Sequence, residues 1–168
     1  MGKLLTPDAY IESIYSITAD MLKAKGIKGL VLDIDNTLVA THEKDAGRHV
    51  IEYIHGLNQR GIKTVIVSNA HRERVEKFCR PLGIKFIYKA HKPFRGGLHQ
   101  AVKLMDLPAQ NLAMVGDQLF TDVLGGNLYG MKTILIKPID PSEPWPIRAK
   151  RLFERPFISN KRYESNLK

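Results

Sequence analysis

Short apolar segments recur along the chain and alternate with segments of helical length. The apolar segments, rich in Val, Ile and Leu, are 29–35, 63–70, 84–89, 112–117 and 132–138. They do not alternate cleanly between apolar and polar residues, which is typical of parallel strands covered on both faces. The intervening segments of helical length are 47–60, 72–82, 96–105 and 119–129. This order predicts an α/β fold with a doubly wound parallel sheet.

The two ends of the chain differ from this repeating part. One helix is predicted to start at Thr6 and Pro7, and another to run from Thr18 to Gly26. Beyond Pro138, four further prolines predict an extension without regular structure. We therefore expect a single domain over residues 1–168, with a helical lead-in at 6–26, an α/β core at 27–138 and a basic C-terminal extension at 139–168.

Composition fits one soluble globular domain. The chain has 168 residues, of which 43% are hydrophobic and 26% charged. Its apolar stretches are far shorter than the roughly 20 residues that a membrane-spanning helix needs. The first ten residues lack the apolar core of a secretory signal, and a single cysteine allows no internal disulfide. These features favour a cytoplasmic protein.

The chain is strongly basic. Its 26 Lys and Arg against 17 Asp and Glu give a formal net charge of +9, and part of the excess lies in the C-terminal extension. Such a charge attracts phosphates, nucleic acid or an anionic membrane surface. A solvated basic tail explains the extension equally well, so the charge does not choose among these partners.

Polar residues with catalytic potential follow four of the predicted strands. In chain order they are Asp33, Asp35, Thr37, Ser68, Asn69, Lys92, Asp117 and Asp122. The carboxyl ends of parallel strands lie on one edge of the sheet, where ligands bind. A cluster of carboxylates there repels itself and implies a hard divalent cation. Each motif alone could be a turn or a helix cap, but turns do not explain four motifs at four strand ends.

The ordered set D-I-D-N-T, S-N, K-P and G-D-x-x-x-T-D resembles the haloacid dehalogenase (HAD) superfamily of phosphotransferases. Within that superfamily the chain is similar to the YqeG-type branch of subclass IIIA, and so to the phosphatidylglycerophosphate phosphatases of mitochondria and plastids. The resemblance covers Thr6 to Pro138, about four fifths of the chain. It implies a HAD-like, Rossmannoid sheet.

The resemblance also implies a mechanism. Asp33 is the expected nucleophile, forming an aspartyl-phosphate that divides a slow hydrolysis into two displacements. Asp35 is the expected general acid and base. Ser68 and Lys92 would bind the phosphate, with Lys92 neutralising developing charge.

The remaining motif residues are expected to hold a Mg²⁺ ion or to support the phosphate. Thr37 and Asn69 would support or bind the phosphate. The predicted metal ligands are Asp33, Asp35 through its backbone carbonyl, Asp117 and Asp122.

The chain departs from the family at Leu128. Relatives commonly show Arg at this position, after Gly-Gly-Asn, so a headgroup contact by that Arg is not expected here.

Short spacings between the motifs predict an active site without a cap. Thr37 and Ser68 are 31 residues apart, and Ser68 and Lys92 are 24 apart. One helix and one strand fill each interval, whereas a cap domain needs at least roughly 50 residues. An open site favours a bulky substrate that shields the site itself, such as a phosphoprotein or a lipid headgroup.

The sequence therefore predicts a Mg²⁺-dependent phosphatase acting on a large or lipid substrate such as phosphatidylglycerophosphate. Its basic extension would contact the anionic inner face of a membrane. Two alternatives stay open: a phosphatase of a soluble metabolite, nucleotide or phosphoprotein, and a non-enzymatic module that binds RNA or a protein partner. Nucleic acid is the less favoured partner, and the sequence does not indicate the oligomeric state.

Overall fold

The protein is built on a six-stranded parallel sheet. In the computed structural model, residues 2–140, 142, 145–158, 162–165 and 167 are described. The sheet has the strand order β1-β6-β5-β2-β3-β4, with every neighbouring pair parallel. The strands are β1 (Ala9–Ile11), β2 (Gly29–Leu32), β3 (Lys63–Val67), β4 (Phe86–Ile87), β5 (Leu112–Gly116) and β6 (Lys132–Ile136). The predicted α/β class and parallel sheet are confirmed.

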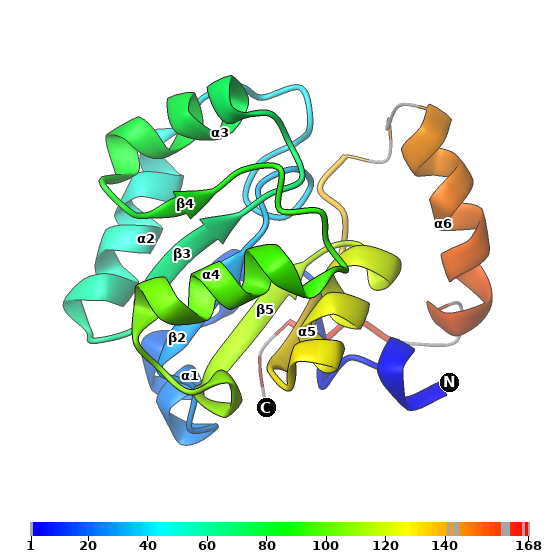
Figure 1. The fold of residues 1–168 in the computed structure, drawn as a ribbon, viewed down its shortest axis with the longest axis horizontal. Coiled ribbons are helices and arrows are strands. Elements are labelled where there is room, and N and C mark those ends of the chain that lie inside the picture. The colour runs from blue at the N-terminus through cyan, green and yellow to red at the C-terminus, as the bar shows by residue number, and fades with distance from the viewer. Residues whose placement is uncertain (1, 141, 143–144, 159–161, 166, 168) are drawn as a thin grey trace.

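Helices cover both faces of the sheet (Figure 1). They are α1 (Ala19–Ala24), α2 (Arg48–Gln59), α3 (Arg72–Cys79), α4 (Arg95–Met105), α5 (Leu124–Tyr129) and α6 (Trp145–Ile158). Short turns of 3-10 helix are η1 (Gly2–Leu5), η2 (Ile14–Ser16), η3 (Arg80–Leu82) and η4 (Ala109–Asn111), and η5 (Leu119–Val123) is π-helical. Buried side chains of α1, α2 and α3 join one core cluster, whereas those of α4 join the other.

The central strand β2 shows why the strand segments lack clean alternation. Leu30 and Leu32 lie in the core cluster that contains α1 to α3, and Val31 lies in the cluster that contains α4. Successive side chains of a strand point to opposite faces, and here both faces are covered by helices. Both sets of positions must therefore be apolar, as the sequence pattern indicated.

The helix predicted to start at Thr6 and Pro7 is wrong. The chain instead forms the short edge strand β1, which pairs with β6 in the register Ala9 with Ile134. A strand of three residues is too short to produce a periodic signal, and its pairing partner lies more than 120 residues away along the chain. The second predicted lead-in helix is confirmed as α1, whose N-cap Thr18 accepts a hydrogen bond from the backbone N–H of Met21.

The expectation that residues beyond Pro138 lack regular structure is also wrong, because α6 lies there. Pro146 falls in the first turn of α6, where a proline removes no helical hydrogen bond. After α6, Glu164 forms an isolated parallel β-bridge with Ile11 of β1, and its N–H donates to the carbonyl of Tyr10 at 2.8 Å. Pro141 and Pro144 lie outside the described residues.

The segments between the motifs carry no inserted domain. From Thr37 to Lys92, all of which is described, the helices and strands are α2, β3, α3, η3 and β4. The absence of a cap in this interval agrees with the prediction. In Figure 1, α6 stands beside the sheet, on the side toward which the strands point.

Two helical glycines should respond in opposite ways to alanine. A Cβ at Gly126 in α5 would lie 2.5 Å from the Cγ2 of Thr133 and 2.9 Å from the Cβ of Met114, whereas a Cβ at Gly56 in α2 meets nothing within 4 Å. We expect Gly126→Ala to lower the free energy of unfolding by about 1–3 kcal/mol through overpacking. Gly56→Ala should raise it by roughly 0.5–1 kcal/mol. Urea denaturation of both variants checks this, and equal changes would contradict the packing of α5 on the sheet.

Candidate active site

The candidate site lies where the strand order of the sheet reverses. β2 and β5 are neighbours at the centre, and the chain runs outward from β2 through β3 to β4 on one side and from β5 to β6 on the other, where β1 forms the edge. Asp33 directly follows β2 and Asp117 directly follows β5. The backbone N–H of Asp33 donates to the carbonyl of Val115 at 3.0 Å, which continues the pairing of the two strands up to the site. Such a switch point at the carboxyl edge is where ligands bind in open α/β sheets.

Three carboxylates converge at this edge. Asp33, Asp117 and Asp122 each offer an oxygen, and these oxygens lie within 4.8 Å of one another. All three residues are buried, at 7%, 2% and 1% exposure. Like charges this close in a buried place repel strongly, so the arrangement needs positive charge nearby.

Gly116 makes room for this convergence. A Cβ built on Gly116 would lie 2.2 Å from the Cγ of Asp122, which is closer than any side chain allows. Asp122 is held at this position because its Oδ2 accepts a hydrogen bond from the N–H of Gln118 at 3.1 Å. The glycine before Asp117 therefore brings the second carboxylate of the motif against the strand end.

Lys92 supplies one positive charge. Its Nζ lies 3.1 Å from Asp33 Oδ1 and 2.7 Å from Asp122 Oδ1, with only 1% of the side chain exposed. Burial lowers the pKa of Lys92, but the charges of Asp122 and Asp33 outweigh it and raise the pKa above its ordinary value. The ammonium thus stays charged between two of the three carboxylates.

Burial has the opposite effect on the acids. It raises the pKa of Asp33 to about 7, since Lys92 offsets only part of the desolvation and Asp122 adds repulsion. Burial also raises the pKa of Asp117, against the attraction of Arg151. Ionised carboxylates are therefore costly in this cluster, and additional positive charge would favour them.

The other predicted residues follow the strands at the same edge of the sheet. The Thr37 hydroxyl donates to Asp117 Oδ1 at 3.4 Å. The Oγ of Ser68 accepts from the N–H of Ala70 at 3.1 Å, and Ser68 is buried beside the end of β3. The Asn69 side chain makes two hydrogen bonds with the backbone of Lys92. Its Oδ1 accepts from the N–H at 2.8 Å, and its Nδ2 donates to the carbonyl at 3.2 Å. The structure thus brings Thr37 against the carboxylates and ties Asn69 to the lysine.

Asp35 differs from the other acids, because its side chain pairs with a residue that the sequence did not indicate. Arg74 Nη2 lies 3.0 Å from Asp35 Oδ1, and the same guanidinium donates to the carbonyls of Glu43 and Lys44. Arg74 therefore fixes both the Asp35 carboxylate and the loop that follows it. No sequence motif marks Arg74, which lies in α3, the second helix after Asp35 in the chain.

Two residues of α6 also reach the site and were missed. Arg151 contacts the carboxylate and the backbone carbonyl of Asp117. Glu154 is buried and accepts hydrogen bonds from the N–H groups of Leu119 and Phe120 at 2.7 and 3.2 Å. Both lie in the basic segment that the sequence also allowed to be a solvated tail.

Leu128, the position where the sequence departs from the family, lies on α5 and is 44% exposed.

The residues present fit a hard divalent cation. The donors are carboxylate oxygens, the ligand type that Mg²⁺ and similar ions prefer. With Lys92 alone, three ionised carboxylates leave two uncompensated negative charges, which a divalent ion would balance. Asp33, Asp117 and Asp122 are the side chains that would hold it.

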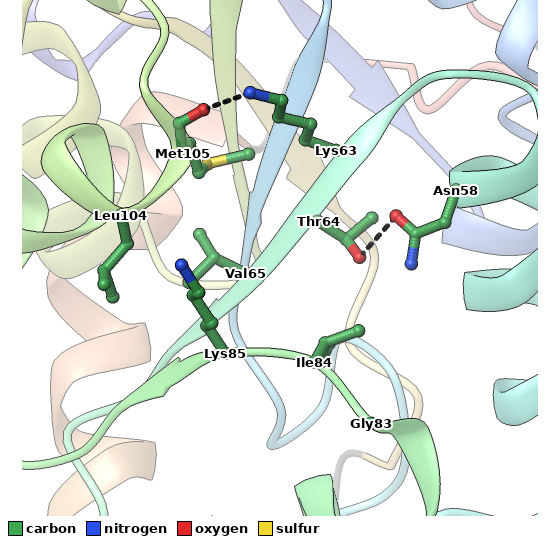
Figure 2. A pocket seen from close by; sticks show the side chains of 9 residues that line it. All are labelled: Asn58, Lys63, Thr64, Val65, Gly83, Ile84, Lys85, Leu104 and Met105. Carbon is green, nitrogen blue, oxygen red and sulfur yellow. Dashed lines mark hydrogen bonds between the residues drawn. The ribbon is translucent and has the colours of Figure 1, made fainter.

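A separate pocket lies at the other edge of the sheet. Figure 2 shows Lys63, Thr64 and Val65 of β3 together with residues 83–85, which precede β4, around this pocket. The Lys63 ammonium there donates to the carbonyl of Met105 at 2.6 Å. The pocket is at the amino ends of the strands, so it is distinct from the carboxylate cluster.

A phosphatase family model and relatives described as phosphatases match most of the chain in sequence. The family model described as "Mitochondrial PGP phosphatase" matches residues 2–140. "Probable phosphatase YqeG" of Bacillus subtilis is 42% identical over 159 residues, covering 95% of this chain and 92% of that protein. "Phosphatidylglycerophosphate phosphatase 1, chloroplastic" of Chlamydomonas reinhardtii is 31% identical over 148 residues, covering 82% of this chain and 55% of that protein.

Solved structures share the fold at lower identity. The cobalt-bound deoxy-D-mannose-octulosonate 8-phosphate phosphatase of Haemophilus influenzae has a TM-score of 0.55 at 16% identity, covering 83% of this chain and 90% of that one. An uncharacterized protein of Listeria monocytogenes has a TM-score of 0.53 at 16% identity, covering 70% and 85%. The sequence matches and the shared fold agree, and the chain belongs to the mitochondrial PGP phosphatase family, as a YqeG-type phosphatase.

Proposed function

We propose that this phosphatase hydrolyses a phosphate monoester through an aspartyl-phosphate on Asp33, with Mg²⁺ held by Asp33, Asp117 and Asp122. The observation that carries the proposal is the convergence of these three buried carboxylates with Lys92 at the switch point of the sheet. The backbone carbonyl of Asp35 is a further proposed ligand. When bound, the cation would supply the positive charge that an anionic phosphate needs in order to approach Asp33.

The chain's own residues account for the two displacements. In the first, a carboxylate oxygen of Asp33 bonds to phosphorus as the bond to the leaving alcohol breaks, and Asp35 donates a proton to that alcohol. In the second, water attacks the same phosphorus and Asp35 takes up its proton. Phosphate then leaves and Asp33 is regenerated as a carboxylate.

Phosphate binding is assigned to the residues around Asp33. The Lys92 ammonium lies 3.1 Å from Asp33, so it is placed to neutralise charge that develops on the transferring group. Ser68 has a hydroxyl hydrogen to donate to a phosphate oxygen. Thr37 donates a hydrogen bond to Asp117, and Asn69 accepts one from the backbone of Lys92. These contacts support the proposal that both residues support phosphate binding.

The proposed substrate is phosphatidylglycerophosphate, the phospholipid named for the matched family and for the Chlamydomonas reinhardtii relative. A lipid headgroup suits a site without a cap, because the membrane and the substrate together can exclude water. The chain spans 55% of the length of that relative. None of the helices in the described part of the chain is long and apolar enough to cross a membrane.

An exposed apolar face of α6 supports peripheral membrane contact. Leu152, Phe153 and Phe157 are 60%, 72% and 44% exposed, and Arg148 on the same helix is exposed as well. Apolar side chains with flanking cations are the composition of helices that rest on an anionic leaflet. Because Arg151 of this helix contacts Asp117, α6 itself lies beside the proposed site.

Replacing the nucleophile tests the chemistry. We expect Asp33→Asn to lower kcat for a phosphomonoester by at least roughly 10³-fold, because the amide keeps the shape but loses the attacking oxygen anion. Asp20→Asn, a change to an exposed carboxylate on α1, should leave kcat unchanged. EDTA should silence the wild type and added Mg²⁺ should restore it. Turnover by a folded, pure Asp33→Asn protein would refute the mechanism.

Vesicle assays test the lipid assignment. We expect the protein to sediment with phosphatidylglycerol vesicles at low salt, to release them at high salt, and to hydrolyse phosphatidylglycerophosphate in them. Phe153→Ser should weaken sedimentation several-fold. Leu104→Ser, which changes an exposed residue beside the pocket at the opposite edge, should not. Good turnover of a small sugar phosphate without vesicle binding or lipid turnover would favour a soluble substrate.

A further inference from the structure

The side chain of Arg151 enters the carboxylate cluster from outside the α/β core. Its guanidinium contacts both the side chain and the backbone carbonyl of Asp117, and it lies 3.2 Å from Glu154 Oε2. Only 16% of the Arg151 side chain is exposed, and the side chain of Asp117 is fully buried. This is a desolvated ion pair with one of the proposed metal ligands.

Glu154 fastens the same helix to the segment after Asp117. Its Oε1 accepts from the N–H groups of Leu119 and Phe120, which begin η5, and its Oε2 faces Arg151. The rings of Phe120 and Phe157 also meet edge to face, with centroids 6.1 Å apart. Helix α6 is therefore attached at several points to the segment that carries Asp117 and Asp122.

The charges of the cluster make Arg151 and a divalent cation alternatives. With Lys92 in place, a divalent ion would balance the three carboxylates, and Arg151 supplies half of that charge. Both would use the Asp117 carboxylate, where two cations at contact distance repel each other in a poorly solvated place. Arg151 has another partner in Glu154, so leaving Asp117 would not leave its charge unpaired.

We propose that Arg151 occupies the position of the missing positive charge and that the divalent cation displaces it from Asp117, which makes α6 a metal-responsive strap over the active-site edge. This inference rests on the proposed metal site. Displacement would keep Arg151 on Glu154 and loosen the contact between α6 and the core. The metal-free chain would thus hold its carboxylate cluster together with an internal cation.

The metal affinity of matched variants tests the inference. Arg151→Gln removes the competing charge, and Arg148→Gln removes the same charge from an exposed position on the same helix. By titration calorimetry with Mg²⁺ and by Mn²⁺ electron paramagnetic resonance, Arg151→Gln should bind on the order of tenfold more tightly than the wild type. Arg148→Gln should match the wild type. Equal or weaker binding by Arg151→Gln would overturn the inference.

Hydrogen exchange gives a readout that is independent of affinity. Mg²⁺ should speed the exchange of α6 amides in the wild type and leave it unchanged in Arg151→Gln, where the contact between residue 151 and Asp117 is already lost. Slower or unchanged exchange in metal-loaded wild type would contradict displacement. If Arg151→Gln does not fold, Arg151→Lys replaces it and should bind metal with intermediate affinity, because it keeps the charge without the paired contacts.

The two proposals fail in different ways. If the wild type and Arg151→Gln bind metal with equal affinity, the proposed metal site stands and the proposed displacement of Arg151 is wrong. No binding by any folded variant would remove the metal site and the strap together. Asp117→Asn assigns the measured ion to the cluster, since binding should fall sharply when this ligand loses its charge.

Discussion

The repulsion among three buried carboxylates is the constraint on which the rest of the site depends. Oxygens of Asp33, Asp117 and Asp122 come within 4.8 Å of one another in a place with little water, so burial and the neighbouring charges raise the cost of ionising Asp33 and Asp117. Lys92 relieves part of this cost, and a second positive charge is needed for the rest. We attribute that charge to a divalent cation in the working enzyme and to Arg151 in its absence.

The sheet creates this constraint through its topology. Parallel pairing of β2 with β5 aligns their carboxyl ends, so the residues that follow Leu32 and Gly116 must meet. The lack of a side chain at Gly116 then lets Asp122 approach to a distance that a Cβ would forbid. Positive groups in this buried cluster are fixed in position before an anionic phosphate binds, so they can stabilise its charge.

Much of the core was predictable from sequence, because its signals are local. Buried strands gave apolar runs, and Thr18 gave a helix start. The motif acids, Ser68 and Lys92 follow strands in chain order, so the edge they share could be inferred from the parallel topology. By contrast, β1 is defined by pairing with a distant strand, and Arg151 and Glu154 act through tertiary contacts across about 35 residues. No periodicity or motif records such contacts.

The most direct test of the account is to trap the phosphorylated carboxylate. Borohydride reduces an acyl phosphate to an alcohol and so converts a phosphorylated aspartate into homoserine, which mass spectrometry of peptides can locate. During turnover with Mg²⁺, we expect homoserine at position 33, and none there in Asp33→Asn. A fully active protein quenched in the steady state, with reduction at another residue or at none, would contradict Asp33 as the nucleophile.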